Sequence, residues 1–370
     1  MAQTGGPRDF LGDARILIAS AEKSKAPAMP QVSSPMRNPL SLLASLGILT
    51  GSVFAADAPA TKPADPNAAK PAPPKRVDPV LPTPTAADVA YGPHKKQVLH
   101  FWKAESDKPT PLLFYIHGGG WKGGNRTSVA GLLPVMLKEG ISVVSIEYRF
   151  TPEATADGVS PPVKGPLHDA ARALQFVRSK AKEWNIDRAR IGASGGSAGA
   201  CSSLWLAFHP DMADPKSSDP IAHESTRLWC AAVSGAQTTL DPKQMKEWTP
   251  NSKYGGHAFG FKGDVAAKLS EFDEFLAKRD TILPWIAEYS PYALVTSDDP
   301  PIYLGYGAPP ALGQDQKDPT HTSNFGVKLQ EHCKANGVEC ELVYQGAPDV
   351  KHATAQAFLI EKLKGAPAKK

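Results

Sequence analysis

The sequence has little of what identifies metalloproteins, disulfide-rich proteins and nucleic-acid-binding proteins. Its 370 residues include only four cysteines, and no Cys-x-x-Cys or His-x-x-x-His pair suggests a metal site. The net charge is only +4 and lies partly in lysine-containing tails, so no basic surface for nucleic acid is expected. No internal repeat is visible. We therefore expect no metal, no organic cofactor and no nucleic-acid partner.

The four cysteines divide into two pairs. Cys333 and Cys340 flank the end of a predicted helix and the next strand, and they could pair in an oxidising compartment. Cys201 and Cys230 fall in apolar segments and are expected to be buried thiols.

An apolar stretch near the N-terminus, residues 40–54, is too short and too weakly hydrophobic for a stable membrane span. It follows a positive charge at Arg37 and ends in small residues, which is the pattern of a secretory signal peptide. We predict a signal peptide over residues 36–56 and an exported protein, periplasmic or extracellular. Residues 1–35 are then an upstream extension or a gene-start artefact, with translation starting at Met36.

Proline, in contrast, is abundant. The chain has 36 prolines, well above the average usage of roughly 5%. Many lie in a Pro/Ala/Lys-rich segment that cannot bury apolar surface. We predict a disordered linker over residues 57–88 and one folded domain over residues 89–365.

Within that domain, strand and helix patterns alternate, as an α/β sheet requires. Short apolar runs predict strands at 97–102, 112–116, 142–148, 190–194, 228–234, 302–306 and 338–344. Apolar residues at helical spacing from Ala170 to Trp184 predict a helix that packs on the sheet. The fold class is therefore α/β, with a central, mostly parallel sheet flanked by helices.

Two glycine-rich motifs follow predicted strands, about eighty residues apart. The first is HGGGW at residues 117–121, whose glycines let backbone N–H groups approach a substrate oxygen. The second is GGSAG at residues 195–199, a G-x-S-x-G pattern that holds a serine on a tight strand-to-helix turn. Together they predict an oxyanion hole and an exposed nucleophile.

The second pattern matches twice in overlap, so both Ser194 and Ser197 are candidates. We prefer Ser197 because residues 190–194 are a good strand and residues 200–209 a good helix. An elbow at Ser194 would begin that helix with two glycines, which costs roughly 1 kcal/mol for each.

In this order the two motifs resemble the α/β-hydrolase superfamily, and specifically its HGGG-type carboxylesterases, similar to hormone-sensitive lipase and to feruloyl and acetyl esterases. The likeness covers roughly residues 90–363. It implies a catalytic triad in the chain order Ser, Asp or Glu, His. The two remaining members should therefore follow Ser197.

For the base we predict His352, in a loop between the last predicted strand and a final helix near residues 354–364. Its rivals are His321, which precedes a predicted helix, and His332, which lies inside one. For the acid we predict Asp318, which is similar to the family's pattern of an aspartate shortly before an N-capped helix. Asp315 in the same loop is the alternative.

These assignments define a mechanism without metal or cofactor. His352 would take the proton of Ser197 as the hydroxyl attacks an acyl carbon, and Asp318 would orient the imidazole. The N–H groups of Gly118, Gly119 and Ala198 would receive the developing oxyanion, each contributing roughly 3 kcal/mol to lowering the barrier.

Substrate contacts are less well defined by the sequence. Trp121, next to the oxyanion glycines, is expected to touch substrate. Residues 239–299, between two predicted strands, are expected to form a cap-like insertion whose aromatic residues could line a pocket or a core.

We therefore expect an exported serine carboxylesterase acting on short to medium acyl esters, small molecules or acyl groups linked to polysaccharide. The alternatives are an amide hydrolase, either arylformamidase-like or a serine peptidase of the same fold, and a non-catalytic binding protein on a hydrolase scaffold. The sequence leaves the oligomeric state open.

Overall fold

The computed structural model describes residues 81–365. The predicted signal peptide, the residues before it and most of the predicted linker lie outside this range. Ordered structure begins slightly earlier than expected, because the first strand includes Ala86 to Ala90. Within the described residues, no helix is long and apolar enough to cross a membrane.

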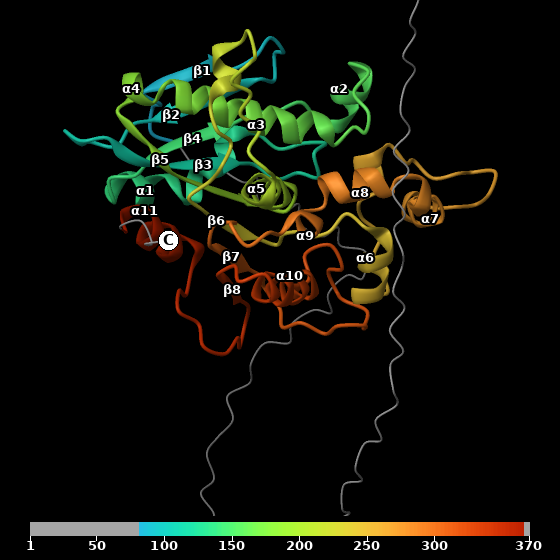
Figure 1. Cartoon of the computed structure of the whole chain (residues 1–370). Helices are drawn as coiled ribbons and strands as arrows, with labels where there is room; N and C mark the ends of the chain where they lie inside the picture. The colour runs from blue at the N-terminus through green and yellow to red at the C-terminus, as the bar shows by residue number, and fades with distance from the viewer. Residues whose placement is uncertain (1–80, 366–370) are drawn as a thin grey trace, which may run out of the picture. The chain divides into compact units, whose positions relative to one another are not determined.

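An eight-stranded sheet forms the centre of the protein (Figure 1). The strands in chain order are β1 (Ala86–Ala90), β2 (Val98–Trp102), β3 (Thr110–Ile116), β4 (Ser142–Ile146), β5 (Ile186–Gly196), β6 (Cys230–Ser234), β7 (Ile302–Gly305) and β8 (Cys340–Val343). Their order across the sheet is β1-β2-β4-β3-β5-β6-β7-β8. The pairs from β4 to β8 are parallel, and β2 runs antiparallel to both β1 and β4. The predicted mostly parallel sheet is confirmed.

Helices connect the parallel strands. They are α1 (Leu133–Lys138), α2 (Thr151–Ala156), α3 (Lys164–Ser179), α4 (Ala181–Trp184), α5 (Ala198–Phe208), α6 (Pro242–Trp248), α7 (Glu271–Ala277), α8 (Leu283–Tyr289), α9 (Pro291–Leu294), α10 (Ser323–Ala335) and α11 (Ala355–Lys364). Short 3-10 helices are η1 (Arg126–Gly131), η2 (Pro220–His223), η3 (Gly256–Phe259) and η4 (Arg279–Thr281).

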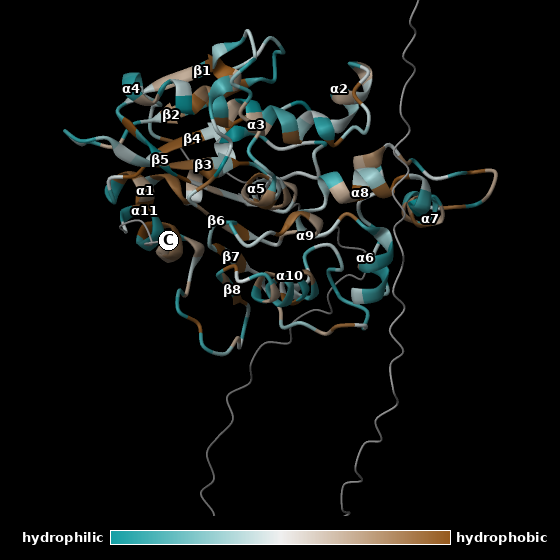
Figure 2. Cartoon of the chain, viewed as in Figure 1, coloured by the Kyte–Doolittle hydropathy of each residue, from teal (hydrophilic) through white to brown (hydrophobic). Residues whose placement is uncertain are grey.

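The alternation of side chains along the strands creates two hydrophobic layers. Leu113 and Val143 point to one face, where they pack with residues of α1 and α11. Leu112 and Phe114 point to the other face, toward α3 and α5. Figure 2 shows the hydrophobic colour concentrated on the central strands, with hydrophilic stretches on outer helices such as α6. Burial of both faces explains why these strands are continuous apolar runs in the sequence.

The insertion, residues 239–299, lies between β6 and β7 and contains helices α6 to α9. Its aromatic side chains Phe259, Phe272 and Phe275 are buried and belong to the same hydrophobic cluster as α3 and α5. The insertion is therefore an integral part of the domain core.

Candidate active site

Ser197 lies at the turn between β5 and α5. Its backbone has φ 54° and ψ −122°, a strained conformation for a residue with a side chain. A Cβ atom on Gly195 or Gly199 would approach the carbonyl oxygen of Ile116 to 2.3 or 2.1 Å, so the turn tolerates only glycine there. Ser194 instead lies within β5 and is buried. The small residues of the motif thus place Ser197 at the turn.

The imidazole beside Ser197 is that of His321. Its Nε2 lies 2.9 Å from Ser197 Oγ, and its Nδ1 lies 2.8 Å from a carboxylate oxygen of Asp318. Asp318 also accepts hydrogen bonds from the backbone N–H groups of Thr320 and His321, each at 3.2 Å. Ser197, His321 and Asp318 are therefore linked by a continuous chain of contacts, and His321 and Asp318 belong to a single turn.

This serine, histidine and aspartate site is open to solvent. The side chain of His321 is 39% exposed and that of Asp318 is 62% exposed. Partial burial of Asp318 raises its pKa, but the hydrogen bond and charge of His321 and the two backbone N–H groups together outweigh this effect, and the net pKa is lowered. Asp318 therefore stays ionised at neutral pH and can orient the imidazole.

The structure does not bring His352 to Ser197, which corrects the placement expected from the sequence. His352 is buried, with Nδ1 2.9 Å from Glu341 and Nε2 2.8 Å from Glu361. Glu341 is in register with Tyr303, whose ring packs against Phe358 of α11. His352 therefore lies on the α11 face of the sheet, and both of its ring nitrogens are occupied.

The strand order provides a physical reason. Ser197 follows β5, His321 follows β7 and His352 follows β8. With neighbouring strands about 4.8 Å apart, the end of β7 lies roughly 10 Å from that of β5 and the end of β8 roughly 14 Å. The loop after β7 thus needs less reach to present a histidine to the serine.

The segment that follows β6 packs against the turn that carries His321. The buried Gln237 donates from Nε2 to the carbonyl oxygen of Thr320 at 2.6 Å. Gly235 lies directly under the histidine, because a Cβ atom there would be 3.4 Å from the His321 ring. These contacts were not predicted, since no local sequence pattern links residues 235–237 to residues 320–321.

The glycine-rich loop lies on the other side of Ser197. A Cβ atom placed on Gly118 would be 3.5 Å from Cβ of Ser197. Within the described part of the chain, the backbone N–H groups of Gly118, Gly119 and Ala198 have no hydrogen-bond acceptor. Free N–H groups beside a serine hydroxyl are suited to receive negative charge on a substrate oxygen.

Trp121 does not face a substrate surface, contrary to expectation. Its side chain is fully buried, and its Nε1 donates to Ser202 Oγ at 3.0 Å. Trp121 therefore anchors the end of the glycine-rich loop to α5.

The other sequence candidates lie apart from this cluster. Among the described residues, the Asp315 carboxylate contacts neither His321 nor His352. Cys333 and Cys340 are free thiols, and the contact of Cys340 with Cys333, together with burial, raises the pKa of Cys340. No group of three potential metal ligands occurs among residues 81–365.

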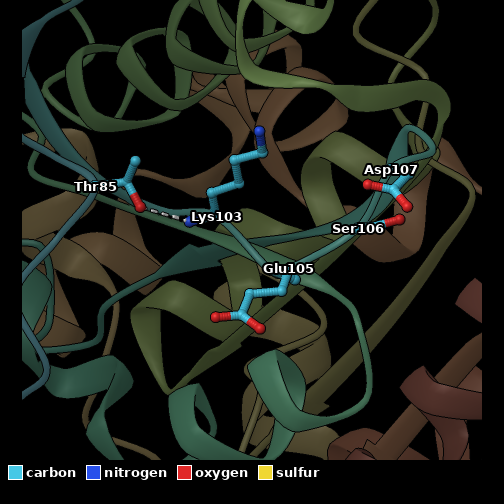
Figure 3. A pocket seen from close by; sticks show the side chains of 6 residues that line it. Thr85, Lys103, Glu105, Ser106 and Asp107 are labelled. Carbon is cyan, nitrogen blue, oxygen red and sulfur yellow. Dashed lines mark hydrogen bonds between the residues drawn. The ribbon is translucent and has the colours of Figure 1, made fainter.

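A surface hollow of about 420 Å³ lies elsewhere, between Thr85 and residues 103–107 (Figure 3). Thr85 there accepts a hydrogen bond from the backbone N–H of Lys103. None of its lining residues belongs to the cluster around Ser197.

Comparison with known proteins identifies the family of the chain. Residues 100–312 match the family BD-FAE. The chain belongs to the BD-FAE family. The matched segment includes the HGGGW loop and the elbow but ends before His321 and His352. The family match therefore does not choose between the two histidines.

Curated relatives of this BD-FAE protein match over part of their length. The chain is 32% identical over 151 residues to a probable carboxylic ester hydrolase, LipM, of Mycobacterium tuberculosis, covering 39% of this chain and 32% of the relative. It is 31% identical over 117 residues to an esterase of Gibberella moniliformis, covering 31% of this chain and 34% of the relative. The chain thus spans about a third of the length of these relatives.

Solved structures share the fold. A truncated carbohydrate esterase from gut microbiota aligns with TM-score 0.56 and 18% identity, covering 78% of this chain and all of that one. Esterase 2 of Thermogutta terrifontis, phosphonylated by sarin, aligns with TM-score 0.54 and 21% identity, covering 76% of this chain and 93% of that one. The fold is that of the α/β-hydrolases.

Proposed function

We propose that this BD-FAE protein is a serine carboxylesterase with Ser197 as nucleophile, His321 as general base and Asp318 as the residue that orients the base. The observation that carries the proposal is the continuous contact from Ser197 Oγ through His321 to Asp318, at 2.9 and 2.8 Å. The names of the curated relatives, a carboxylic ester hydrolase and an esterase, agree with this reaction class.

In the first half of the reaction, Oγ of Ser197 attacks the carbonyl carbon of the ester. His321 Nε2 takes the hydroxyl proton, and Asp318 stabilises the resulting imidazolium through Nδ1–H. The carbonyl oxygen becomes an oxyanion next to the free N–H groups of Gly118, Gly119 and Ala198. His321 then returns the proton to the departing alcohol, and an acyl group remains on Ser197.

In the second half, a water molecule attacks the acyl carbon. His321 takes a proton from this water, the tetrahedral intermediate again places its negative oxygen at the loop, and the carboxylic acid leaves as the proton returns to Ser197. The ester bond is replaced by a carboxylic acid and an alcohol.

The substrates that we propose are short to medium acyl esters, including acyl groups attached to polysaccharide. The exposure of His321 and Asp318 supports this class, because an open site admits an ester that projects from a bulky carrier. We also propose export, which rests on the signal-peptide pattern at residues 36–56. N-terminal sequencing of the mature protein from cells would find a start near Asp57 if this is correct.

The reaction is tested with purified protein, a series of p-nitrophenyl esters from acetate to octanoate, and aminoacyl p-nitroanilides. Ester hydrolysis that is lost in Ser197→Ala, together with fluorophosphonate labelling of Ser197, would support the proposal. Hydrolysis of the amides alone would favour the amide hydrolase. A folded wild-type protein that neither hydrolyses esters nor reacts with the probe would exclude a serine esterase.

A further inference from the structure

One histidine of the insertion hydrogen-bonds to the glycine-rich loop. His257 lies in η3, and its Nε2 is 2.9 Å from the carbonyl oxygen of Gly120. We propose that His257, oriented by Glu271, is a positioning residue that holds the loop in the conformation that receives the oxyanion. The inference rests on the proposed esterase function and assigns a role in that reaction to the insertion.

The direction of the hydrogen bond follows from its acceptor. A carbonyl oxygen can only accept, so Nε2 of His257 must carry a proton. Glu271 approaches the same histidine from α7, with one carboxylate oxygen 2.8 Å from the backbone N–H of His257 and 3.1 Å from Nδ1. The side chain of His257 is only 10% exposed, so water competes little for these contacts. Glu271 thus fixes the backbone of residue 257 through its N–H group, and this places the ring whose Nε2 donates to Gly120.

The loop needs such a contact because three successive glycines leave its backbone unusually free. The flanks are already held: Tyr148 donates to the carbonyl of His117 at 2.7 Å, and Thr151 N–H donates to the carbonyl of Trp121 at 2.8 Å. Between the flanks, His257 is the side chain, among those the structure describes, that hydrogen-bonds to the Gly120 carbonyl. Because a peptide group is planar, fixing this carbonyl also fixes the peptide group between Gly120 and Trp121, which closes the glycine-rich loop.

A second side chain of the insertion supports the same region. The ring of Tyr254 lies edge-on to His257, with centroids 5.0 Å apart, and a Cβ atom on Gly120 would be 3.9 Å from the Tyr254 hydroxyl. The Tyr254 hydroxyl is buried and has no hydrogen-bond partner among the described residues. Tyr254 therefore packs against Gly120 and limits its movement, and His257 donates the hydrogen bond to the Gly120 carbonyl.

Substitutions at residue 257 test this role. Leucine removes the donor, whereas glutamine can place an amide N–H near the position of Nε2. We expect His257→Leu to lower kcat about 10- to 50-fold with KM changed less than about threefold, since misplaced oxyanion donors weaken the transition state more than the ground state. His257→Gln should recover kcat to within about threefold of the wild type, because it restores the donated hydrogen bond.

The matched control is His209→Leu. His209 has a similarly buried side chain, 13% exposed, and a similar contact to a carboxylate, 3.1 Å from Glu288, but it lies at the end of α5 opposite to Ser197. We expect it to leave kcat unchanged. Glu271→Ala should lower kcat, and combining it with His257→Leu should lower kcat no further than His257→Leu alone, because the two residues act as one unit.

The outcomes separate this inference from the proposed function. If the wild type hydrolyses esters and Ser197→Ala does not, the function stands, and an unchanged kcat in folded His257→Leu would overturn only the role of His257. Equal losses in His257→Leu and His257→Gln would also overturn it, because restoring a donor would then have no effect. If the wild type hydrolyses no ester, the proposed function itself fails.

Discussion

Replacing His321 with alanine, and separately His352 with alanine, distinguishes two possible general bases. In His321→Ala, Ser197 Oγ loses the only imidazole within hydrogen-bonding distance among the described residues. Removing a triad histidine costs about 10⁴- to 10⁶-fold in kcat, equivalent to about 5 to 8 kcal/mol of transition-state stabilisation. We expect a loss of this size in His321→Ala without a large change in thermal stability, because the side chain of His321 is 39% exposed.

His352→Ala should behave in the opposite way. His352 is buried and connects Glu341 of β8 with Glu361 of α11. Loss of the hydrogen bond to Glu341, whose side chain is only 14% exposed, costs about 2 kcal/mol of unfolding free energy. The melting temperature should fall by about 4 to 8 °C. At 25 °C, where the variant remains folded, kcat should stay within about threefold of the wild type.

Both variants are assayed with p-nitrophenyl acetate and a fluorophosphonate probe, and their folding is followed by circular dichroism. Wild-type protein and Ser197→Ala give the upper and lower limits of activity. A folded His352→Ala that has lost activity, beside a His321→Ala that retains it, would refute the reasoning from strand order and contact geometry. Loss of activity in both folded variants would also contradict the purely structural role given to His352.

Three further predictions concern other parts of the molecule. Asp318→Asn should lower kcat about 10³- to 10⁴-fold, measured with the same ester, because an amide cannot hold the imidazolium as a carboxylate does. Gln237→Leu should lower kcat with little change in KM, and steady-state kinetics would detect it, since the 2.6 Å hydrogen bond that supports the Thr320 carbonyl is lost. Burial, followed by the charges of Lys164 and His209, lowers the pKa of His168 from 6.5 to about 4. Between these two pKa values the unfolded chain binds a proton that the folded protein does not. The free energy of unfolding therefore falls by up to about 3 kcal/mol as the pH falls from 6.5 to 4. Denaturant unfolding of the wild type and His168→Phe at both pH values would show a smaller decrease in the variant.

The central strands were predictable because both of their faces are buried. The runs that predicted strands at 112–116 and 302–306 correspond to β3 and β7 within two residues at either end. The exception is β1, for which no strand was predicted and whose first three residues fall in the predicted linker. Its residues AADVA are mostly exposed at the edge of the sheet, so they carry no apolar run for a sequence pattern to detect.

The position of Ser197 was also accessible from sequence, because the steric demands of the turn are local. Glycines at 195 and 199 are required by contacts with the neighbouring strand, and these requirements leave a mark on adjacent residues. The histidine was not accessible in the same way. Which of two loops reaches the serine depends on the distance between strand ends and on where each loop's side chains find partners, and neither is recorded in a periodic pattern.

One local signal for His321 existed nevertheless. The sequence Asp-Pro-Thr-His immediately precedes the N-cap of α10 at Thr322, and an aspartate in such a turn can accept the backbone N–H groups two and three residues later. That turn brings the side chain of the third residue back to the same carboxylate. Asp318 and His321 are then oriented by one short stretch of backbone and do not depend on two separate loops docking against each other. Because this turn fixes the pair locally, the tertiary features on which the proposed catalysis depends are its contact with Gln237 and the distance from His321 to Ser197.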